Sequence, residues 1–353
     1  MVTIIAASTY NRPDFINIQY ESIKKHVKCD FNYIVVNNAK FSSIDRDKQS
    51  ETLYQQIKEI CTSLNIDYYE VDICQKTSNK AQSGSIINGK YTSDPYACNY
   101  SIQWTFENIV SKINGKVFII DSDFFFIEDV NLDDIMDNYE CGYIPQYRGH
   151  RKNQNTIDAS VKYMWNMFCA FDTSKNENLK NINWHMTPIN GIPCDVGAQT
   201  HFFIEENMGM KELFFEEHSI YEFKRIDENR IFVHYCLNAN SNYHLVLDSS
   251  YKLLNFTCLE KCCENKTFEY EIDREDYPSY ITSVLKNIIN KIEKYIDIFP
   301  PPLRLGFVKK FDDFNFFGIH YRSGANYLDY STDSYNHKKT YALNKILNLW
   351  NIF

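Results

Sequence analysis

Short apolar segments alternate with helical segments along the first 120 residues of this 353-residue chain. Periodicity and apolar runs predict strands at 2–7, 33–36, 67–72 and 117–120. The spacing of apolar residues predicts helices at 15–25, 49–65 and 96–113. This alternation is typical of a mostly parallel sheet covered by helices, so an α/β fold is expected.

The rest of the chain is less regular. Strands are predicted at 141–145, 163–171, 230–237 and 316–320. Helices are predicted at the end of 192–207, in places within 250–302, and at 338–350, while the polar segment 75–94 is expected to be a mobile loop. Pro300-Pro-Pro302 marks a boundary. We therefore expect a core at 1–205, an accessory or acceptor-side region at 206–302, and an α+β C-terminal segment at 303–353 that returns to the active site.

Composition excludes some classes of function. A net charge of -9 argues against a nucleic-acid partner, because phosphate backbones are bound by Lys and Arg. The odd count of 11 cysteines in a long chain favours reduced thiols over a disulfide framework. The apolar opening is too short for a signal sequence, and no apolar run reaches the roughly 20 residues that cross a bilayer. A soluble, cytoplasmic protein without a transmembrane segment is expected.

Two carboxylates, Asp121 and Asp123, directly follow the most apolar strand predicted in the first half. Side chains at i and i+2 of a strand share a face, so both carboxylates can approach one Mg²⁺ or Mn²⁺ ion. A divalent cation held in this way can neutralise the charge on a departing nucleoside diphosphate. In an α/β sheet this is also the edge where ligands bind.

The sequence Phe118-Ile-Ile-Asp-Ser-Asp-Phe-Phe125 resembles the Asp-x-Asp element of GT-A glycosyltransferases, near the family 2 group. The resemblance continues across most of the chain. It implies a GT-A (Rossmann-like) fold, a Mn²⁺ or Mg²⁺ cofactor and a UDP- or GDP-sugar donor. It also implies an acceptor hydroxyl on a glycan, a lipid or a protein-linked group.

The resemblance assigns the donor site to residues spread over several segments. Asn37 and Asn38 stand where many family members have acidic residues, so the nucleotide base stays open. Asn99 stands where related enzymes have a polar residue, near the start of a helix, that contacts the nucleotide-sugar donor. A solvated surface Asn is the alternative. The implied donor-binding residues are Thr9, Tyr10, Asn11, Arg12, Asn37, Asn38, Asn99, Asp121, Ser122, Arg322 and Lys338, with Lys339 as an alternative to Lys338.

Two further residues carry catalytic or metal-binding expectations from the same resemblance. Asp195, in an Asp-x-Gly segment, is the candidate base that takes the proton of the acceptor hydroxyl, with a helix N-cap as the alternative. His320 is the candidate third metal ligand beside Asp121 and Asp123, with a structural His as the alternative, and it favours Mn²⁺ over Mg²⁺. His234 and His201 are substitutes for it.

Two other functions compete with glycosyl transfer. A nucleotidyltransferase acting on sugar phosphates also uses an α/β sheet and carboxylate-bound metal, but it usually carries an early Gly-rich phosphate loop, and the first 20 residues contain no Gly. A non-catalytic carbohydrate-binding protein of the same fold is the other alternative. The Asn37-Asn38 pair favours it, and the carboxylate pair argues against it.

Overall fold

The computed structural model describes most of the chain. The described ranges are 1–9, 13–38, 48–71, 86–87, 90–91, 95–153, 156–192, 194–237, 241–250, 253–261, 267–270, 283–289, 305–311, 313 and 315–321. They form two compact units, which meet along the chain between Phe215 and Glu216. We describe each unit by itself.

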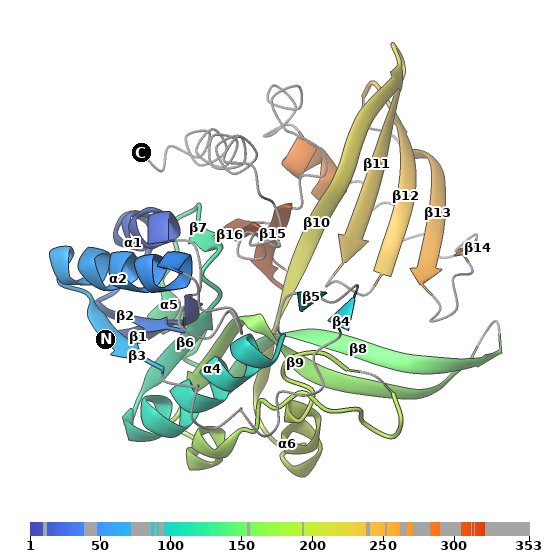
Figure 1. Cartoon of the computed structure of the whole chain (residues 1–353). Helices are drawn as coiled ribbons and strands as arrows, with labels where there is room; N and C mark the ends of the chain where they lie inside the picture. The colour runs from blue at the N-terminus through green and yellow to red at the C-terminus, as the bar shows by residue number, and fades with distance from the viewer. Residues whose placement is uncertain are drawn as a thin grey trace. The chain divides into compact units, whose positions relative to one another are not determined.

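The first unit is built on a mixed sheet (Figure 1). Its strands lie in the order β3, β2, β1, β6, β9, β8 and the start of β10. The first four are parallel, and β9 is antiparallel to both β6 and β8. The bounds are β1 Val2–Thr9, β2 Phe31–Asn37, β3 Asp67–Glu70, β6 Lys116–Ile120, β8 Cys141–Asn153, β9 Thr156–Asp172 and β10 Glu212–Asp227. Short strands stand apart from this order: β4 Ile86–Ile87, β5 Lys90–Tyr91 and β7 Phe124–Phe126.

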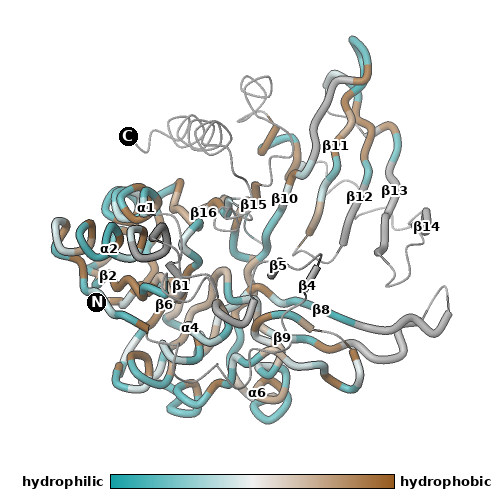
Figure 2. Tube along the Cα trace, viewed as in Figure 1, coloured by the Kyte–Doolittle hydropathy of each residue, from teal (hydrophilic) through white to brown (hydrophobic). Residues whose placement is uncertain are grey.

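Helices flank the parallel strands on both sides (Figure 1). They are α1 Pro13–His26, α2 Lys48–Ser63, α4 Pro95–Asn108, α5 Leu132–Ile135 and α6 Thr200–Glu206, with 3₁₀ turns η3 Val110–Lys112 and η4 Glu177–Asn181. Pro13 opens α1, where its fixed φ favours a helix and its missing N–H costs nothing. Figure 2 shows hydrophobic and hydrophilic residues mixed along α1, as expected for a helix that covers a sheet.

The core explains why the central strands are continuously apolar. A strand between two helical layers is buried on both faces, so it needs no alternation of polar and apolar residues. Val117, Phe118, Ile119 and Ile120 are all fully buried. One face of the sheet packs with α4 in a single cluster, which includes Ile5, Ala7, Ile34, Val36, Ile102, Phe106, Val117 and Ile119.

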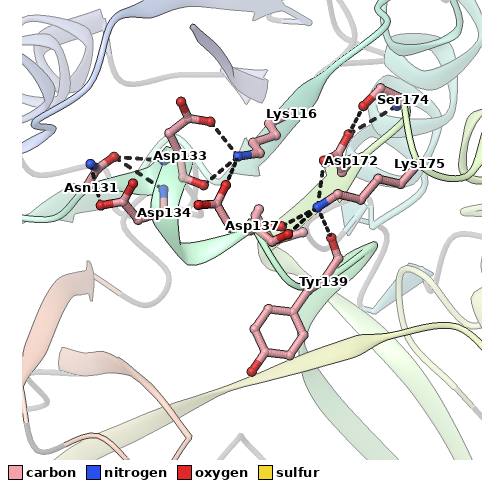
Figure 3. A network of polar contacts seen from close by, with 10 residues as sticks. Lys116, Asn131, Asp133, Asp134, Asp137, Tyr139, Asp172, Ser174 and Lys175 are labelled. Atoms are coloured by element: carbon pink, nitrogen blue, oxygen red, sulfur yellow. Dashed lines mark hydrogen bonds and ion pairs between the residues drawn. The ribbon is translucent and has the colours of Figure 1, made fainter.

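A polar network stabilises the end of β6 where the strand begins (Figure 3). The ammonium of Lys116 forms ion pairs with Asp133 at 2.6 Å and with Asp137 at 2.7 Å. Lys175 forms an ion pair with Asp172 at 3.1 Å and donates to the carbonyls of Met136 and Asp137 at 2.8 Å. Because Asp121 follows the other end of β6, this network supports the fold and does not belong to the candidate site.

The second unit is an antiparallel sheet. From Glu216 onward β10 pairs with β11, and β12, β13 and β14 follow in order. On its other side β10 pairs with β15, and β15 pairs with β16. The bounds are β11 Arg230–Leu237, β12 Ser241–Asp248, β13 Leu253–Lys261, β14 Thr267–Tyr270, β15 Leu305–Lys310 and β16 Phe316–Tyr321, and residues 283–289 are helical.

The predicted α/β class is confirmed, with a sheet more mixed than expected. Residues 283–289 are helical, as expected in places within 250–302, but the strands β13 and β14 in that segment were not predicted. The strand β10 was not predicted at all. Within the segment 75–94, the described residues form the β4–β5 hairpin. The closing helix at 338–350 lies outside the described residues. No helix in the described ranges is long and apolar enough to span a membrane.

Candidate functional site

Asp121, Ser122 and Asp123 form a tight turn at the carboxyl end of β6. The amide of Phe124 donates to the carbonyl of Asp121 at 3.1 Å, which closes the turn before β7. Ser122 and Asp123 are each 5% exposed, whereas Asp121 is half-buried. Keeping an ionised carboxylate this far from water is costly unless positive charge or hydrogen-bond donors compensate. A cation bound by both carboxylates would supply such compensation.

The backbone of this turn is held by Gln19, a buried residue of α1. Its amide nitrogen donates to the carbonyl of Asp121 at 2.8 Å and to the carbonyl of Phe124 at 2.6 Å. The amide oxygen of Gln19 accepts a hydrogen bond from the hydroxyl of Tyr33 at 2.5 Å. Three hydrogen bonds to one buried side chain fix the positions from which the two carboxylates project. The sequence analysis did not identify Gln19, although a Gln among the apolar residues of α1 is a signal for such a role.

An irregularity in β9 brings a polar side chain to Asp121. Cys169 pairs with Tyr143 of β8 and Trp165 pairs with the next β8 residue, so the residues between them bulge from the ladder. Within the bulge, the amide of Asn166 donates to the Asp121 carboxylate at 3.2 Å. Bulges re-aim side chains and are frequent beside active sites. Asn166 was missed because a lone Asn in an apolar strand has no periodicity that identifies it.

The start of α4 contributes to the same place. The amide of Asn166 also lies 3.7 Å from the Cys98 sulfur, so this helix end is next to Asp121. Asn99 is 4% exposed, which excludes the solvated alternative. Its nitrogen lies 3.4 Å from Nδ1 of His185, and its side-chain oxygen has no hydrogen-bond partner among the described residues. A buried acceptor of this kind calls for a ligand or water.

The predicted nucleoside-contact residues are described only in part. Asn37 is buried, and its amide donates to the Tyr54 carbonyl at 3.2 Å and to the Tyr68 hydroxyl at 2.8 Å. Asn38 is buried directly after β2, and the backbone of Thr9 ends β1. The carboxyl ends of β1, β2 and β6 therefore meet along one edge, as predicted. Tyr10, Asn11 and Arg12 lie outside the described residues.

Asp195 is exposed, in turns that precede α6. Its carboxylate accepts from the amide of Val196 at 2.8 Å, and its own amide donates to the hydroxyl of Tyr163 at 3.3 Å. Gln199 occupies the N-cap position of α6, so the N-cap alternative for Asp195 is wrong. Tyr163, which contacts Asp195, and Asn166, which contacts Asp121, are three positions apart in β9.

His320 lies in β16 of the second unit and is 5% exposed. Its Nδ1 is 2.9 Å from Oε1 of Glu217, which leaves Nε2 as the other ring nitrogen. His201, one possible substitute, has both ring nitrogens near local partners, the Lys162 carbonyl at 3.0 Å and Glu205 at 3.3 Å. His234, the other, packs its ring against the rings of neighbouring strands.

Asp121 and Asp123 of the first unit offer two carboxylates to a divalent cation, and His320 is the candidate imidazole ligand in the second unit. Two carboxylates and one imidazole suit a divalent ion that takes oxygen ligands and tolerates nitrogen. The preference for Mn²⁺ over Mg²⁺ stays a prediction. Arg322, Lys338 and Lys339, predicted to bind the diphosphate, lie outside the described residues.

Comparison with protein-family models gives no match, and comparison with curated proteins gives none either. Among solved structures, the chain is similar to the galactosyltransferase LgtC in complex with donor and acceptor sugar analogs. The identity is 15%, the match covers 50% of this chain and 59% of that one, and the TM-score is 0.30. It is also similar to an active-site mutant of LgtC, with 14% identity, 50% and 58% coverage and a TM-score of 0.30.

A third similar structure is the apo form of the glycosyltransferase GlyE from Streptococcus pneumoniae. Here the identity is 12%, the match covers 60% of this chain and 44% of that one, and the TM-score is 0.30. The matches thus span less than two thirds of each of these structures. Likeness at this level does not establish a shared activity, so the function of this chain has to be inferred from its own residues.

Proposed function

We propose that this chain is a metal-dependent glycosyltransferase of the GT-A type. It would transfer a sugar from a nucleoside diphosphate sugar, with UDP or GDP as the nucleotide, to an acceptor hydroxyl. The observation that carries the proposal is the turn at Asp121 and Asp123. The Asp123 carboxylate is buried there, and the Asp121 carboxylate accepts a hydrogen bond from the amide of Asn166. Free thiols at the described cysteines agree with the reducing cytoplasm that we propose as its location.

The metal would be held by Asp121, Asp123 and His320. When bound, a divalent cation stabilises the negative charge that develops on the diphosphate as the glycosidic bond breaks. The two carboxylates come from one rigid turn, and Gln19 and Asn166 maintain their orientation before any ligand arrives. Preorganisation of this kind reduces the free energy that binding would otherwise spend on ordering the site.

The remaining residues act on the two substrates. The unpartnered oxygen of Asn99 would accept a hydrogen bond from a donor hydroxyl, because that oxygen is buried at the start of α4. Thr9, Asn37, Asn38 and Ser122, at the carboxyl ends of β1, β2 and β6, would bind the donor together with Tyr10, Asn11, Arg12, Arg322 and Lys338. The exposed carboxylate of Asp195 would take the proton from the acceptor hydroxyl during attack on the anomeric carbon.

The proposal is tested by a thermal shift screen with UDP- and GDP-sugars, with and without Mn²⁺. A bound ligand raises the midpoint of unfolding, and a transferase should be stabilised by nucleotide and metal together. The same mixtures are then assayed for release of the nucleoside diphosphate. A nucleotidyltransferase would instead release pyrophosphate when given a sugar phosphate and a nucleoside triphosphate. A carbohydrate-binding protein would respond to glycans alone.

The variant Asp123→Ala should lose the joint stabilisation and the release of diphosphate. Asp129→Asn is a matched control, since Asp129 is an exposed carboxylate a few residues further along the same segment. Normal turnover in Asp123→Ala, or no joint effect of nucleotide and Mn²⁺ on the unmodified protein, would refute the proposal.

A further inference from the structure

Glu217 is a fully buried carboxylate of β10 whose side chain reaches across the neighbouring strand. β15 lies between β10 and β16 in the second unit. Oε1 of Glu217 is nevertheless 2.9 Å from Nδ1 of His320, which belongs to β16. Adjacent strands are about 4.8 Å apart, so a residue two strands away is normally out of reach of a side chain. Something in β15 must allow this crossing.

Gly306 is the residue that allows it. In the β15–β16 ladder Gly306 is paired directly with His320. A Cβ at position 306 would overlap with the Glu217 carboxylate and would lie 2.6 Å from its Cγ. Any side chain at 306 would therefore displace Glu217, which has no exposed surface into which it can move. Because Gly306 has no side chain, the Glu217 carboxylate can lie against β15 at this position.

The hydrogen bond selects one form of the imidazole. An ionised Glu217 carboxylate could only accept a hydrogen bond, and the 2.9 Å contact would then require the proton on Nδ1 of His320. In the neutral ring Nε2 then bears the lone pair and is the nitrogen that can coordinate a cation. Histidines that ligate metals usually donate their other ring N–H to a carboxylate or carbonyl, which fixes both the tautomer and the orientation of the ring.

We propose that Glu217 is a positioning residue that holds His320 in the Nδ1–H tautomer, with Nε2 ready for the divalent cation, and that Gly306 is required for this contact. The inference rests on the proposed function, because it takes His320 as a metal ligand. It adds two residues to the site that no motif in the sequence indicates. Both act through His320 and neither touches substrate.

The adjacent carboxylate, Glu216, serves as a contrast. Successive side chains of a strand point to opposite faces. Glu216 accordingly has other partners, Lys309 at 2.7 Å and His218 at 3.1 Å. Both glutamates are buried on the same strand, but Glu217 contacts the candidate ligand His320, whereas Glu216 contacts Lys309 and His218. If Glu216 and Glu217 served only the stability of the unit, replacing either one should have the same effect on metal binding.

The test measures Mn²⁺ affinity directly, from the electron paramagnetic resonance signal of free Mn²⁺ titrated with the full chain and a nucleoside diphosphate. Glu217→Gln and Gly306→Ala should each weaken Mn²⁺ binding by a factor on the order of 10 to 100, as loss of an outer partner of a metal ligand does. Gly209→Ala is the matched glycine control, because a Cβ there meets no atom within 4 Å. Glu216→Gln is the matched carboxylate control. Both controls should keep the affinity of the unmodified chain.

A second measurement separates positioning from loss of fold. Nitrogen-15 NMR correlation through the imidazole ring identifies which nitrogen carries the proton, and the His320 signals are assigned by their absence in His320→Gln. The unmodified protein without metal should show the Nδ1–H tautomer, and Glu217→Gln and Gly306→Ala should show a mixture or the Nε2–H form. The tautomer reports the contact itself in any variant that keeps its other histidine signals.

The outcomes distinguish the inference from the proposed function. Unchanged Mn²⁺ affinity in Glu217→Gln and Gly306→Ala, with affinity lost in Asp123→Ala, overturns the inference and leaves the metal site intact. The inference is also overturned, with the metal site intact, if His320→Gln keeps its Mn²⁺ affinity while Asp123→Ala loses it. If Asp123→Ala binds Mn²⁺ normally, the proposed function fails. An Nε2–H tautomer in the unmodified protein overturns the inference by itself, whatever the metal does.

Discussion

The buried carboxylate of Glu216 should make the second unit sensitive to acid, by an amount that follows from its surroundings. Burial disfavours the charged form, but hydrogen bonds and charge from His218 and Lys309 outweigh it and lower the pKa of Glu216 from 4.5 to about 2. Burial also lowers the pKa of His218. Nδ1 of His218 lies 2.6 Å from the hydroxyl of Tyr235.

The sign and size of the effect follow from linkage. A carboxyl group whose pKa is lower in the folded state stabilises that state above its unfolded pKa, and the contribution is lost as the pH falls from about 4.5 to about 2. Lowering the pKa from 4.5 to about 2, at about 1.4 kcal/mol per pH unit, is worth between about 3 and 4 kcal/mol. Solvent screening takes little from this, because the Glu216 side chain is only 9% exposed and that of Lys309 is 0% exposed.

The assay is the free energy of unfolding from urea titrations, followed by far-ultraviolet circular dichroism between pH 6.5 and pH 2.5. Glu216→Gln should be less stable than the unmodified protein near neutral pH, because it leaves the buried ammonium of Lys309 without its countercharge. The difference should shrink by about 2 to 3 kcal/mol between pH 6.5 and pH 2.5, because the unfolded chain takes up a proton at Glu216 over this range while the folded protein still holds the carboxylate largely ionised.

Asp227→Asn is the control for this experiment. Asp227 also has a lowered pKa, owing first to its hydrogen bond with Arg230, but it is exposed and solvent screens its ion pair. Its removal should leave the pH profile nearly unchanged. If the stability difference between the unmodified protein and Glu216→Gln stays constant from pH 6.5 to pH 2.5, Glu216 is not held ionised in the folded state and the reasoning is refuted.

Two further predictions concern the segment around α6. Asp195→Asn should lower turnover by a factor on the order of 100 or more while donor affinity, measured by calorimetry, stays near normal; collapse of donor binding would place Asp195 in the donor site instead. Gly197→Ala should lower the free energy of unfolding by about 2 kcal/mol or more, because Gly197 has a φ of 86° and an added Cβ would lie 2.5 Å from the carbonyl oxygen of Met164. Gly191→Ala, at a φ of 78° with no atom within 4 Å, should cost only the left-handed conformation, so equal losses in urea titrations of the two variants would contradict the steric argument.

Much of the first unit could be predicted because its signals are local. Strands buried on both faces have continuous apolar runs, and β6 is the clearest case. The turn at Asp121 and Asp123 was found for a related reason, since two carboxylates directly after such a strand are conspicuous. The hairpin of β8 and β9 was predicted too short, because Arg148 and Lys162 interrupt the apolar pattern towards its tip.

The second unit was predicted less well. β10 has two glutamates and a histidine in succession at positions 216 to 218, which conceal a buried strand. Their burial is possible only because Lys309 and His320 come from strands about 90 residues or more further along the chain. No periodicity within β10 carries that information.

The sequence by itself determined the α/β class and the location of the carboxylate pair, because hydrophobic periodicity and strand order act over short distances along the chain. Only the tertiary structure decided which polar residues serve that pair. Gln19 and Asn166 reach Asp121 from 102 and 45 positions away. Glu217 reaches His320 because Gly306, on the strand between them, has no side chain to block it. Hydrogen bonds of this kind depend on how strands are paired and on the space beside a residue that has no Cβ. No local sequence pattern predicts either.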